Sequence, residues 1–452
     1  MTRSRKVHSR CRAIRRLLTF SSQGDASFKR KIVVLLALGL LVRVVLMPIA
    51  FHPDLFWITY HAQRLALHGE VTKDLSIQPV PHLLYAATIW LFQPALSPPE
   101  VVWPDEWALL DQEESQGAFD MWMQITSAPR IHLTLFILKL PHLAFDLACA
   151  AILLALLRER SRGTVVAFAF WMFNPIGLYI SYLYGRYDVV AAFFIFLALY
   201  FYDRFRPLSS LAALTLALLS RIIDAALAPF FLIGAFRQLE RQKRLLVGAL
   251  VFGAVALVTI LSGALPRVIA LLDRAHGQFL LAAKLPIMLH DELVLFVIAY
   301  GLLLFSSLEK DLSCYTVIRK YSSMVFLTMF SLAFFNPQYF FALLPLLALE
   351  IAEQPRLLWF HMVQIAGYAV YLLNWSSQTT WWLLLPLNPA LFSTLPAPEL
   401  IIQSYANYKA VIAIFRSLLT AASLWMAYLI YRSVPLAKHV SGPDHQSPRI
   451  VS

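Results

Sequence analysis

The stretch from Ile131 to Leu157 reads IHLTLFILKLPHLAFDLACAAILLALL, and it decides the class of fold. A transmembrane helix needs about 20 mostly apolar residues. This stretch is longer, and only Lys139 and Asp146 in it carry a formal charge. Apolar runs of spanning length recur on both sides of it, from Ile32 to Tyr431. The pattern predicts an all-α, polytopic membrane protein.

The composition of the whole chain favours the same class. Of the 452 residues, 59% are hydrophobic and 14% are charged, whereas soluble domains average roughly 45–50% apolar and about 25% charged residues. A soluble enzyme, a disordered chain, a secreted disulfide module and a nucleic-acid binder are therefore excluded. The cysteines Cys11, Cys149 and Cys314 are too scattered for a disulfide framework or a thiolate metal site.

We expect about 12 transmembrane helices (roughly 10–13), because each apolar run of spanning length accounts for one crossing. Ten runs are interpreted as single spans: Ile32–Phe51, Ile131–Leu157, Thr164–Tyr184, Asp188–Tyr202, Leu245–Ala264, Glu292–Leu308, Tyr321–Phe335, Tyr339–Ile351, Leu357–Trp375 and Tyr408–Tyr431. Leu208–Phe236 is too long for one span and is interrupted from Ser220 to Asp224, so it is predicted to form two short helices. The first run is too long for a signal-peptide core and is interpreted as a retained anchor.

Basic residues predict which side of the membrane each loop faces. The formal net charge is +12, and with the N-terminus inside, 26 of the 38 Lys and Arg residues lie in inner segments, as the positive-inside rule requires. We therefore predict a cytoplasmic tail (1–31), a transmembrane domain (32–431) and a cytoplasmic C-terminal tail (432–452). A bacterial inner membrane is favoured over the endoplasmic reticulum, because the sequence has no retention signal and most loops are short.

The first outer loop, residues 52–130, differs from the others because it is long and acidic. Within it, Pro79–Leu96 is apolar but short, so we expect a helix that lies along the outer interface. A second outer loop, Leu265–Asp291, carries Arg274 and Lys284. A long loop after the first span is typical of a catalytic domain rather than of a carrier.

Asp54 follows the first span directly. With Trp57, His61 and Arg64 it falls on one stripe of a helix, which presents a carboxylate, an aromatic ring, an imidazole and a guanidinium at the outer membrane surface. A wet interfacial helix with ordinary belt aromatics explains the same pattern. The position of the carboxylate immediately after a span favours function, because a general base that serves a lipid-borne substrate must lie close to the lipid boundary.

Ionisable residues inside the apolar runs form a second group of candidates. Lys139 and Asp146 lie on one helix face, and buried charges in a membrane are costly, which indicates function or a structural pair. Arg221 and Asp224 have the i, i+3 spacing that permits self-pairing, although the planar guanidinium is equally suited to a phosphate. Asp188 suits a helix N-cap.

The order of these features resembles the GT-C superfamily of integral membrane glycosyltransferases, especially its branches that use polyprenyl-phosphate mannose or glucose. The resemblance spans roughly Ile32 to Tyr431. It is carried by short motifs: the outer-loop aspartate, Lys139-Leu140-Pro141 with Asp146, Asn174-Pro175, Gly185-Arg186-Tyr187-Asp188, Asn336-Pro337-Gln338-Tyr339 and Leu343-Leu344-Pro345.

The resemblance implies an inverting transfer of a hexose, mannose favoured, from a polyprenyl-phosphate donor to a glycan, lipid or protein hydroxyl at the non-cytoplasmic face. It implies that Asp54 is the catalytic base and that basic residues hold the donor phosphate. The family's usual Gly-Gln pair reads Gly185-Arg186 here, so Arg186 becomes a further binding candidate. The substrate-binding candidates are His52, Trp57, His61, Arg64, Asp146, Arg186, Asp188, Arg221, Arg274, Lys284 and Gln338.

No cofactor is expected. Asp54 has no acidic neighbour, which weakens the case for a divalent metal, and the histidines of the outer loop follow no recognised zinc motif. The expected partners are the sugar donor, the acceptor and membrane lipids, without nucleic acid. Two other hypotheses remain: a transporter or lipid flippase, although no matching halves are found in the sequence, and a non-catalytic assembly partner in envelope or glycan synthesis.

Overall fold

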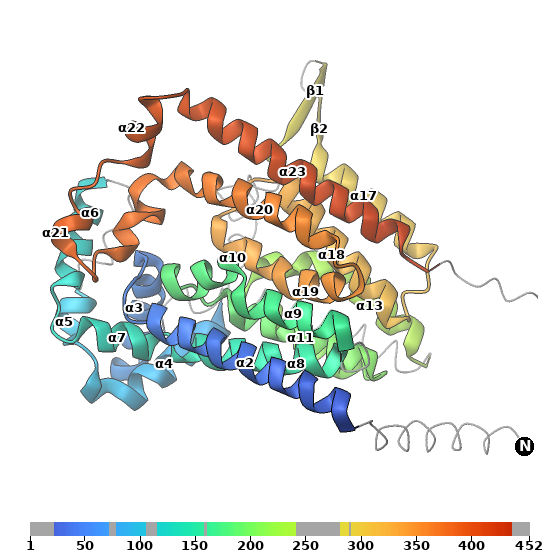
Figure 1. Ribbon diagram of the computed structural model, residues 1–452, viewed down its shortest axis with the longest axis horizontal. Coiled ribbons are helices and arrows are strands. Elements are labelled where there is room, and N and C mark those ends of the chain that lie inside the picture. The colour runs from blue at the N-terminus through green and yellow to red at the C-terminus, as the bar shows by residue number, and fades with distance from the viewer. Residues whose placement is uncertain are drawn as a thin grey trace, which may run out of the picture. The chain divides into compact units, whose positions relative to one another are not determined.

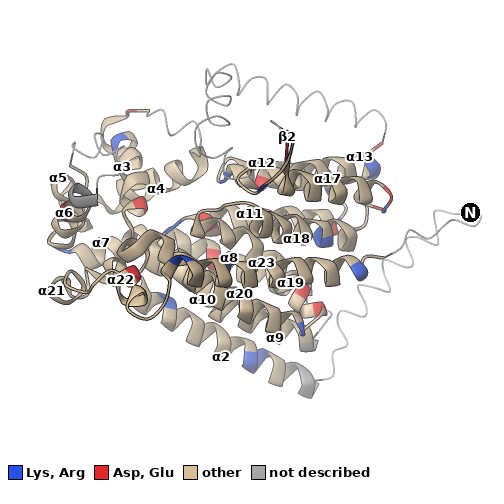
Figure 2. Ribbon diagram, turned by 90° about the horizontal axis from the view of Figure 1, so that it is seen from above, with Lys and Arg blue, Asp and Glu red and all other residues tan. Residues whose placement is uncertain are grey.

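The computed structural model describes residues 22–71, 78–104, 115–157, 161–240, 281–288 and 291–435. Of the described residues, 79% are helical, which confirms the all-α class at this coarse level. Four helices are long and apolar enough to cross a membrane, among the described residues: Ile131–Leu157, Gly163–Tyr184, Leu357–Thr379 and Tyr408–Arg432. Figure 2 shows how sparse Lys, Arg, Asp and Glu are along the described helices, as a membrane protein requires.

The chain divides into two compact units. The first comprises Met1–Tyr200, Ala213–Asp224 and Asn336–Ala422, and the second comprises Phe201–Ala212, Ala225–Phe335 and Ser423–Ser452. The described elements of the first unit are α2 (Ser22–Leu46), α3 (Pro53–His68), α4 (Pro79–Phe92), η2 (Gln93–Ala95), α5 (Pro99–Val102), α6 (Ser115–Thr126), α7 (Ile131–Leu138), α8 (Leu140–Leu157), α9 (Ser161–Phe173), α10 (Pro175–Leu178), the π-helix η4 (Tyr179–Tyr184), η6 (Pro337–Leu343), α19 (Leu344–Glu353), α20 (Leu357–Tyr371), η7 (Leu372–Thr379), η8 (Trp381–Leu384), α21 (Pro389–Phe392) and α22 (Pro398–Gln403).

The second unit contains α13 (Ala228–Gln238), the antiparallel strands β1 (Lys284–Met288) and β2 (Asp291–Val294), α17 (Leu295–Leu308) and α18 (Tyr315–Leu332). Its helices α13, α17 and α18 pack on one another. Four elements contribute residues to both units: α11 (Asp188–Asp203), α12 (Pro207–Leu218), η5 (Ile222–Leu227) and α23 (Tyr408–Arg432).

The core of the first unit is built around α9, which packs on α2, α8 and α19 (Figure 1). Gly163 makes the approach of α9 to α19 possible, since a Cβ at this position would lie 2.1 Å from the carbonyl oxygen of Ala352. Such small residues at helix contacts are common in membranes, where close backbone packing replaces the hydrophobic effect as the driving force.

Several predicted boundaries differ from those observed. The first apolar run forms α2, which ends at Leu46 rather than at Phe51, because Pro48 follows and helices end near the residue before a proline. The run that begins at Ile131 is divided at Lys139 into α7 and α8. The hairpin β1–β2, absent from the all-α prediction, precedes α17.

The two predicted short helices of Leu208–Phe236 are α12 and α13, separated by η5. The predicted span Leu245–Ala264 lies outside the described residues.

The segment 52–130, which was predicted to be the first outer loop, is helical over much of its described part. The predicted interfacial segment Pro79–Leu96 forms α4 and η2, and α4 packs along α3. The outward face of α4 keeps large apolar side chains exposed, namely Leu83, Trp90 and Leu91. This apolar stripe fits a helix that lies against a lipid surface.

Candidate functional site

Asp54 stands at the start of α3, in a position that local sequence determines. Pro53 occupies the first helical position, where its fixed φ suits the turn and its missing N–H costs nothing. His52 is the N-cap residue, and its Nδ1 accepts a hydrogen bond from the backbone N–H of Asp54 at 3.2 Å. The His52 ring stacks on Tyr184, with the ring centroids 4.0 Å apart. The helix start therefore holds Asp54 in one place.

Arg186 lies opposite this carboxylate. Its Nη1 is 2.8 Å from Asp54 Oδ2, and the Tyr184 hydroxyl donates to the same oxygen at 3.4 Å. The Asp54 side chain is 34% exposed, whereas that of Arg186 is 11% exposed. Gly185 turns the chain between η4 and Arg186 with φ +82°, a conformation that disfavours other residues. An accessible carboxylate thus touches a mostly buried cation.

The charges around Asp54 determine its protonation. Burial by itself would raise the pKa of the carboxyl, but the nearby groups Arg186, His52 and Arg221 together outweigh burial and lower it. The pKa of Asp54 is therefore held well below its usual range, and the group is an anion at neutral pH.

A second pair lies beside the first. Arg221 donates from Nε and Nη2 to the two carboxylate oxygens of Asp188, both at 2.7 Å, and both side chains are 4% exposed. Arg186 Nε lies 3.9 Å from Asp188 Oδ2, which links the pairs. Asp54, Arg186, Asp188 and Arg221 alternate in sign, and we call these four residues the charge cluster. Its guanidinium groups also lie over aromatic rings, Arg186 over Tyr187 and Arg221 over Tyr187 and Tyr339.

Arg221 does not form the pair with Asp224 that the i, i+3 spacing predicted. Arg221 binds Asp188, and both carboxylate oxygens of Asp224 are buried with no hydrogen-bond partner among the described residues. Burial, together with the negative charge of Asp188, raises the pKa of Asp224 well above its usual value. Asp188, which the sequence predicted to be an N-cap, instead forms a bidentate ion pair with Arg221. Bidentate charge-assisted pairs are among the strong hydrogen-bonding interactions.

Lys139 and Asp146 do not pair with each other. The ammonium group of Lys139 donates to the carbonyl oxygens of Met47 (2.9 Å), Tyr182 (2.7 Å) and Ala50. Two of these carbonyls precede Asp54 and the third precedes Arg186, so Lys139 ties together the two segments that carry the accessible pair.

The carboxylate of Asp146 accepts hydrogen bonds from three side chains. They are Arg43 Nε at 2.6 Å, the Tyr182 hydroxyl at 2.7 Å and Trp171 Nε1 at 2.7 Å. This network lies between helices of the bundle and leaves the Asp146 carboxylate no obvious capacity for a substrate.

The other binding candidates lie in separate surroundings. Trp57 packs its ring on His61, and Arg64 pairs with Glu70 at 2.8 Å. Gln338 is buried, and its Oε1 has no hydrogen-bond partner among the described residues. Lys284 pairs with Glu292 across the β1–β2 hairpin of the second unit. Arg274 lies outside the described residues.

Sequence reasoning missed the aromatic residues of the site. Tyr184, Tyr187 and Tyr339 surround the charge cluster, and the sequence YLYGRYD around Gly185 is the signal that could have found two of them. The buried contact of the Tyr85 hydroxyl with His142 Nε2 (2.5 Å) was also missed, because the two residues come from different segments.

Within the part of the chain that the structure describes, no group of three or more His, Cys, Asp or Glu side chains could hold a metal ion. The cluster instead offers an anionic acceptor of protons and cationic donors for an anion, side by side. No protein-family model, curated protein or solved structure matches the chain. Its function is therefore inferred from the chemistry of these residues.

Proposed function

We propose that the protein is an inverting membrane glycosyltransferase. It transfers a hexose, mannose favoured, from a polyprenyl-phosphate donor to a hydroxyl of a glycan, lipid or protein at the non-cytoplasmic face of the membrane. The observation that carries the proposal is the 2.8 Å contact between Arg186 and the accessible Asp54 carboxylate. A glycosyl transfer from a lipid phosphate needs this combination, a base for the acceptor and a cation for the phosphate.

The reaction is a single displacement at the anomeric carbon. The acceptor oxygen forms the new bond to that carbon on one face, while the bond from the carbon to the phosphate oxygen breaks on the other. The bonding electrons leave with the polyprenyl phosphate, whose added negative charge Arg186 stabilises. Asp54 takes the proton of the acceptor hydroxyl, so that charge and atoms balance.

Donor binding also makes Asp54 a better base. While Arg186 is paired with it, Asp54 has a pKa well below its usual range and holds a proton weakly. The donor phosphate competes for Arg186, whose buried Nε–H has no hydrogen-bond partner among the described residues and can donate to a phosphate oxygen. When Arg186 pairs with the phosphate instead of Asp54, the proton affinity of Asp54 rises. Asp54 can then take the proton of the acceptor hydroxyl. Arg221 stays with Asp188 and keeps this neighbour oriented.

The proposal includes the membrane arrangement. About 12 helices cross a bacterial inner membrane, with both termini in the cytoplasm and the loop 52–130 outside. The donor lipid lies between helices and its sugar phosphate reaches the outer surface beside α3. The apolar outward stripe of α4 and the four long apolar helices support a membrane setting.

The test is transfer by the full chain in nanodiscs, with radiolabelled polyprenyl-phosphate mannose or glucose and membrane extract as acceptor. Asp54→Asn should abolish transfer, and Asp120→Asn, an exposed acid in α6 of the same loop, should not. Retained transfer in Asp54→Asn would refute the base. Absence of transfer from either donor by the wild type would refute the proposed reaction, and movement of the lipid across the bilayer of proteoliposomes would then identify a flippase.

A further inference from the structure

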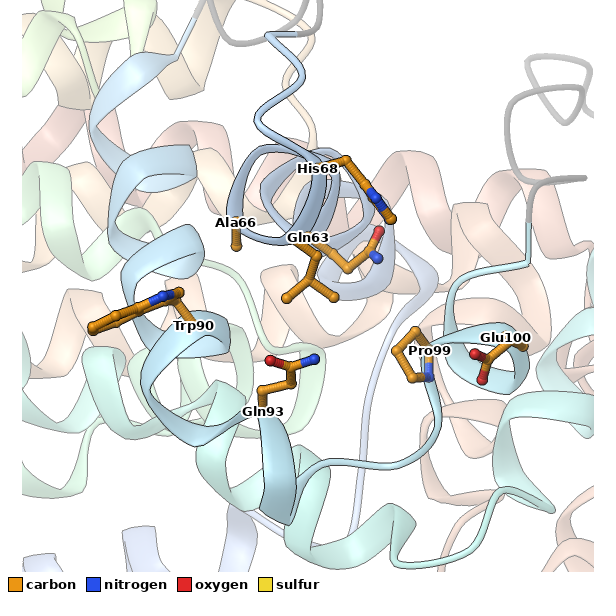
Figure 3. A pocket seen from close by; sticks show the side chains of 8 residues that line it. Gln63, Ala66, His68, Trp90, Gln93, Pro99 and Glu100 are labelled. Carbon is orange, nitrogen blue, oxygen red and sulfur yellow. The ribbon is translucent and has the colours of Figure 1, made fainter.

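A cavity of about 520 Å³ opens between α3, α4 and α5, in the first outer loop (Figure 3). Gln63 and His68 reach it from α3, Trp90 from α4, and Gln93 from η2, while Pro99 and Glu100 close it from α5. Its volume falls in the range of about 300–1,000 Å³ that is usual for small-molecule sites. We call it the outer-loop pocket.

The lining of the outer-loop pocket suits a polyhydroxylated ligand. Trp90 is 69% exposed, and an exposed indole offers a flat face to the C–H side of a sugar ring. Two amides, an imidazole and a carboxylate supply both donors and acceptors for hydroxyl groups, from Gln63, Gln93, His68 and Glu100. The described lining contains no Lys or Arg.

The pocket lies at the far end of α3 from Asp54. At about 1.5 Å per residue, Gln63 is roughly 13 Å and His68 roughly 21 Å along the helix axis from Asp54. The sugar that reacts at Asp54 therefore does not occupy the pocket. A ligand that used both places would have to be extended, with its far end at Trp90 and its reactive hydroxyl at the start of α3.

We propose that the outer-loop pocket binds the distal sugars of an extended oligosaccharide acceptor. Its role in positioning the acceptor rests on the proposed glycosyl transfer, whereas its affinity for saccharide does not. The exposed apolar side chains of Leu83 and Leu91 on α4, which are not part of the pocket lining, set the pocket at the lipid surface, where the glycan of a lipid-linked acceptor emerges. Among the glycan, lipid and protein acceptors of the proposed reaction, this pocket favours a glycan.

The test measures saccharide binding separately from transfer. The full chain in nanodiscs is titrated calorimetrically with tetrasaccharides of mannose, glucose and N-acetylglucosamine, and with the matching monosaccharides. At least one tetrasaccharide should bind saturably and more tightly than its monosaccharide. Trp90→Ala should weaken this binding about tenfold, as expected for loss of a stacking face, and Glu100→Gln should weaken it about threefold.

Two control variants separate the possible results. Trp359→Ala removes a similarly exposed tryptophan from α20 and should leave binding unchanged, as should Asp120→Asn, an exposed acid in α6 outside the pocket lining. Binding that survives in Trp90→Ala, or is lost equally in Trp359→Ala, would overturn the inference, and so would failure of every tetrasaccharide to bind.

The inference and the proposed function can fail independently. If the wild type transfers sugar to a short acceptor but binds no tetrasaccharide, the proposed reaction is supported and saccharide binding by the outer-loop pocket is refuted. If tetrasaccharide binding depends on Trp90 but no transfer occurs from either donor, the saccharide site stands and the proposed reaction does not.

Discussion

The Arg43–Asp146 pair and the Arg186–Asp54 pair have the same chemistry in different surroundings. Asp146 accepts hydrogen bonds from Arg43, Trp171 and Tyr182, and Arg43 also donates to the carbonyl oxygens of Gly39 and Met172. Both members of this pair are buried. The Asp54 carboxylate, in contrast, is one-third exposed, and Arg186 keeps an unused donor in the described structure. The Arg43–Asp146 pair is buried and fully hydrogen-bonded, whereas the Arg186–Asp54 pair can still bind a ligand.

The difference shows how to distinguish a structural charge from a functional one in a membrane protein. A buried ion pair repays its desolvation only if hydrogen bonds satisfy its remaining atoms, as they do around Asp146. A pair with an exposed anion and an incompletely bonded cation gives up some of that stabilisation. It gains the capacity to exchange its partner for a substrate group. Four experiments test this contrast, each directed at one group.

The largest effect is expected from removal of Arg43. Arg43→Met leaves the Asp146 charge buried without its counter-ion and should lower the free energy of unfolding by about 3–5 kcal/mol. Unfolding in mixed micelles measures this loss. The double variant Arg43→Met/Asp146→Leu should recover most of it. Arg64→Met, which breaks the partly exposed pair with Glu70, should cost less than about 1 kcal/mol. Equal losses in both single variants would contradict the structural role of the buried pair.

Arg186→Gln should produce the next largest effect, on activity rather than on stability. Loss of the cation that stabilises the departing phosphate should lower transfer by about 10²–10³-fold, with the protein still folded. Full transfer by Arg186→Gln would remove Arg186 from the proposed mechanism.

Asp224→Asn should stabilise the protein at neutral pH. The pKa of Asp224 is raised in the folded state, so the wild type is most stable below the unfolded pKa of about 3.9 and loses stability as the pH rises above it. The amide carries no such cost, and a gain on the order of 1 kcal/mol at pH 7 is expected. Unfolding midpoints at pH 5 and pH 8 measure it. An identical pH dependence in the two proteins would show that Asp224 does not titrate in this range.

The smallest effect concerns the pH dependence of Asp54. Its pKa is lowered in the folded state, so its contribution to stability is full above the unfolded pKa of about 3.9 and is lost as the pH falls below it. Wild type and Asp54→Asn should therefore differ by a constant amount from pH 8 to pH 5. The acid limb of transfer should lie at higher pH in Arg186→Gln, where the cation no longer lowers the pKa. Superimposable acid limbs would contradict the coupling between Arg186 and Asp54.

Much of the local structure was predictable from the sequence because it depends on neighbours in the chain. The apolar runs ending at Leu157 and Tyr431 are helices in the structure. The position of Asp54 in the first turn of a helix also follows from local features, since Pro53 and His52 start α3 there. The hairpin β1–β2 and the break at Lys139 were not anticipated. Lys139 sits at a break because its ammonium group bonds three carbonyls from other segments.

The partners of the charges could not be predicted in the same way. The i, i+3 rule paired Arg221 with Asp224, and the seven-residue spacing placed Lys139 near Asp146, yet the observed partners come from distant segments. Arg43 and Asp146 are 103 positions apart in the chain. Local spacing decides only which groups can meet along one helix, whereas the packing of several helices decides which of them meet.

By itself, the sequence determined that the chain is a helical, apolar protein suited to a membrane, and that a carboxylate follows the first apolar run. Both depend on composition and on short-range backbone rules. Only the tertiary structure decided that Arg186 faces Asp54, that Arg221 is committed to Asp188 and that Asp224 is left without a hydrogen-bond partner among the described residues. In a low-dielectric interior each charge takes the best partner that packing offers, and packing depends on the whole chain.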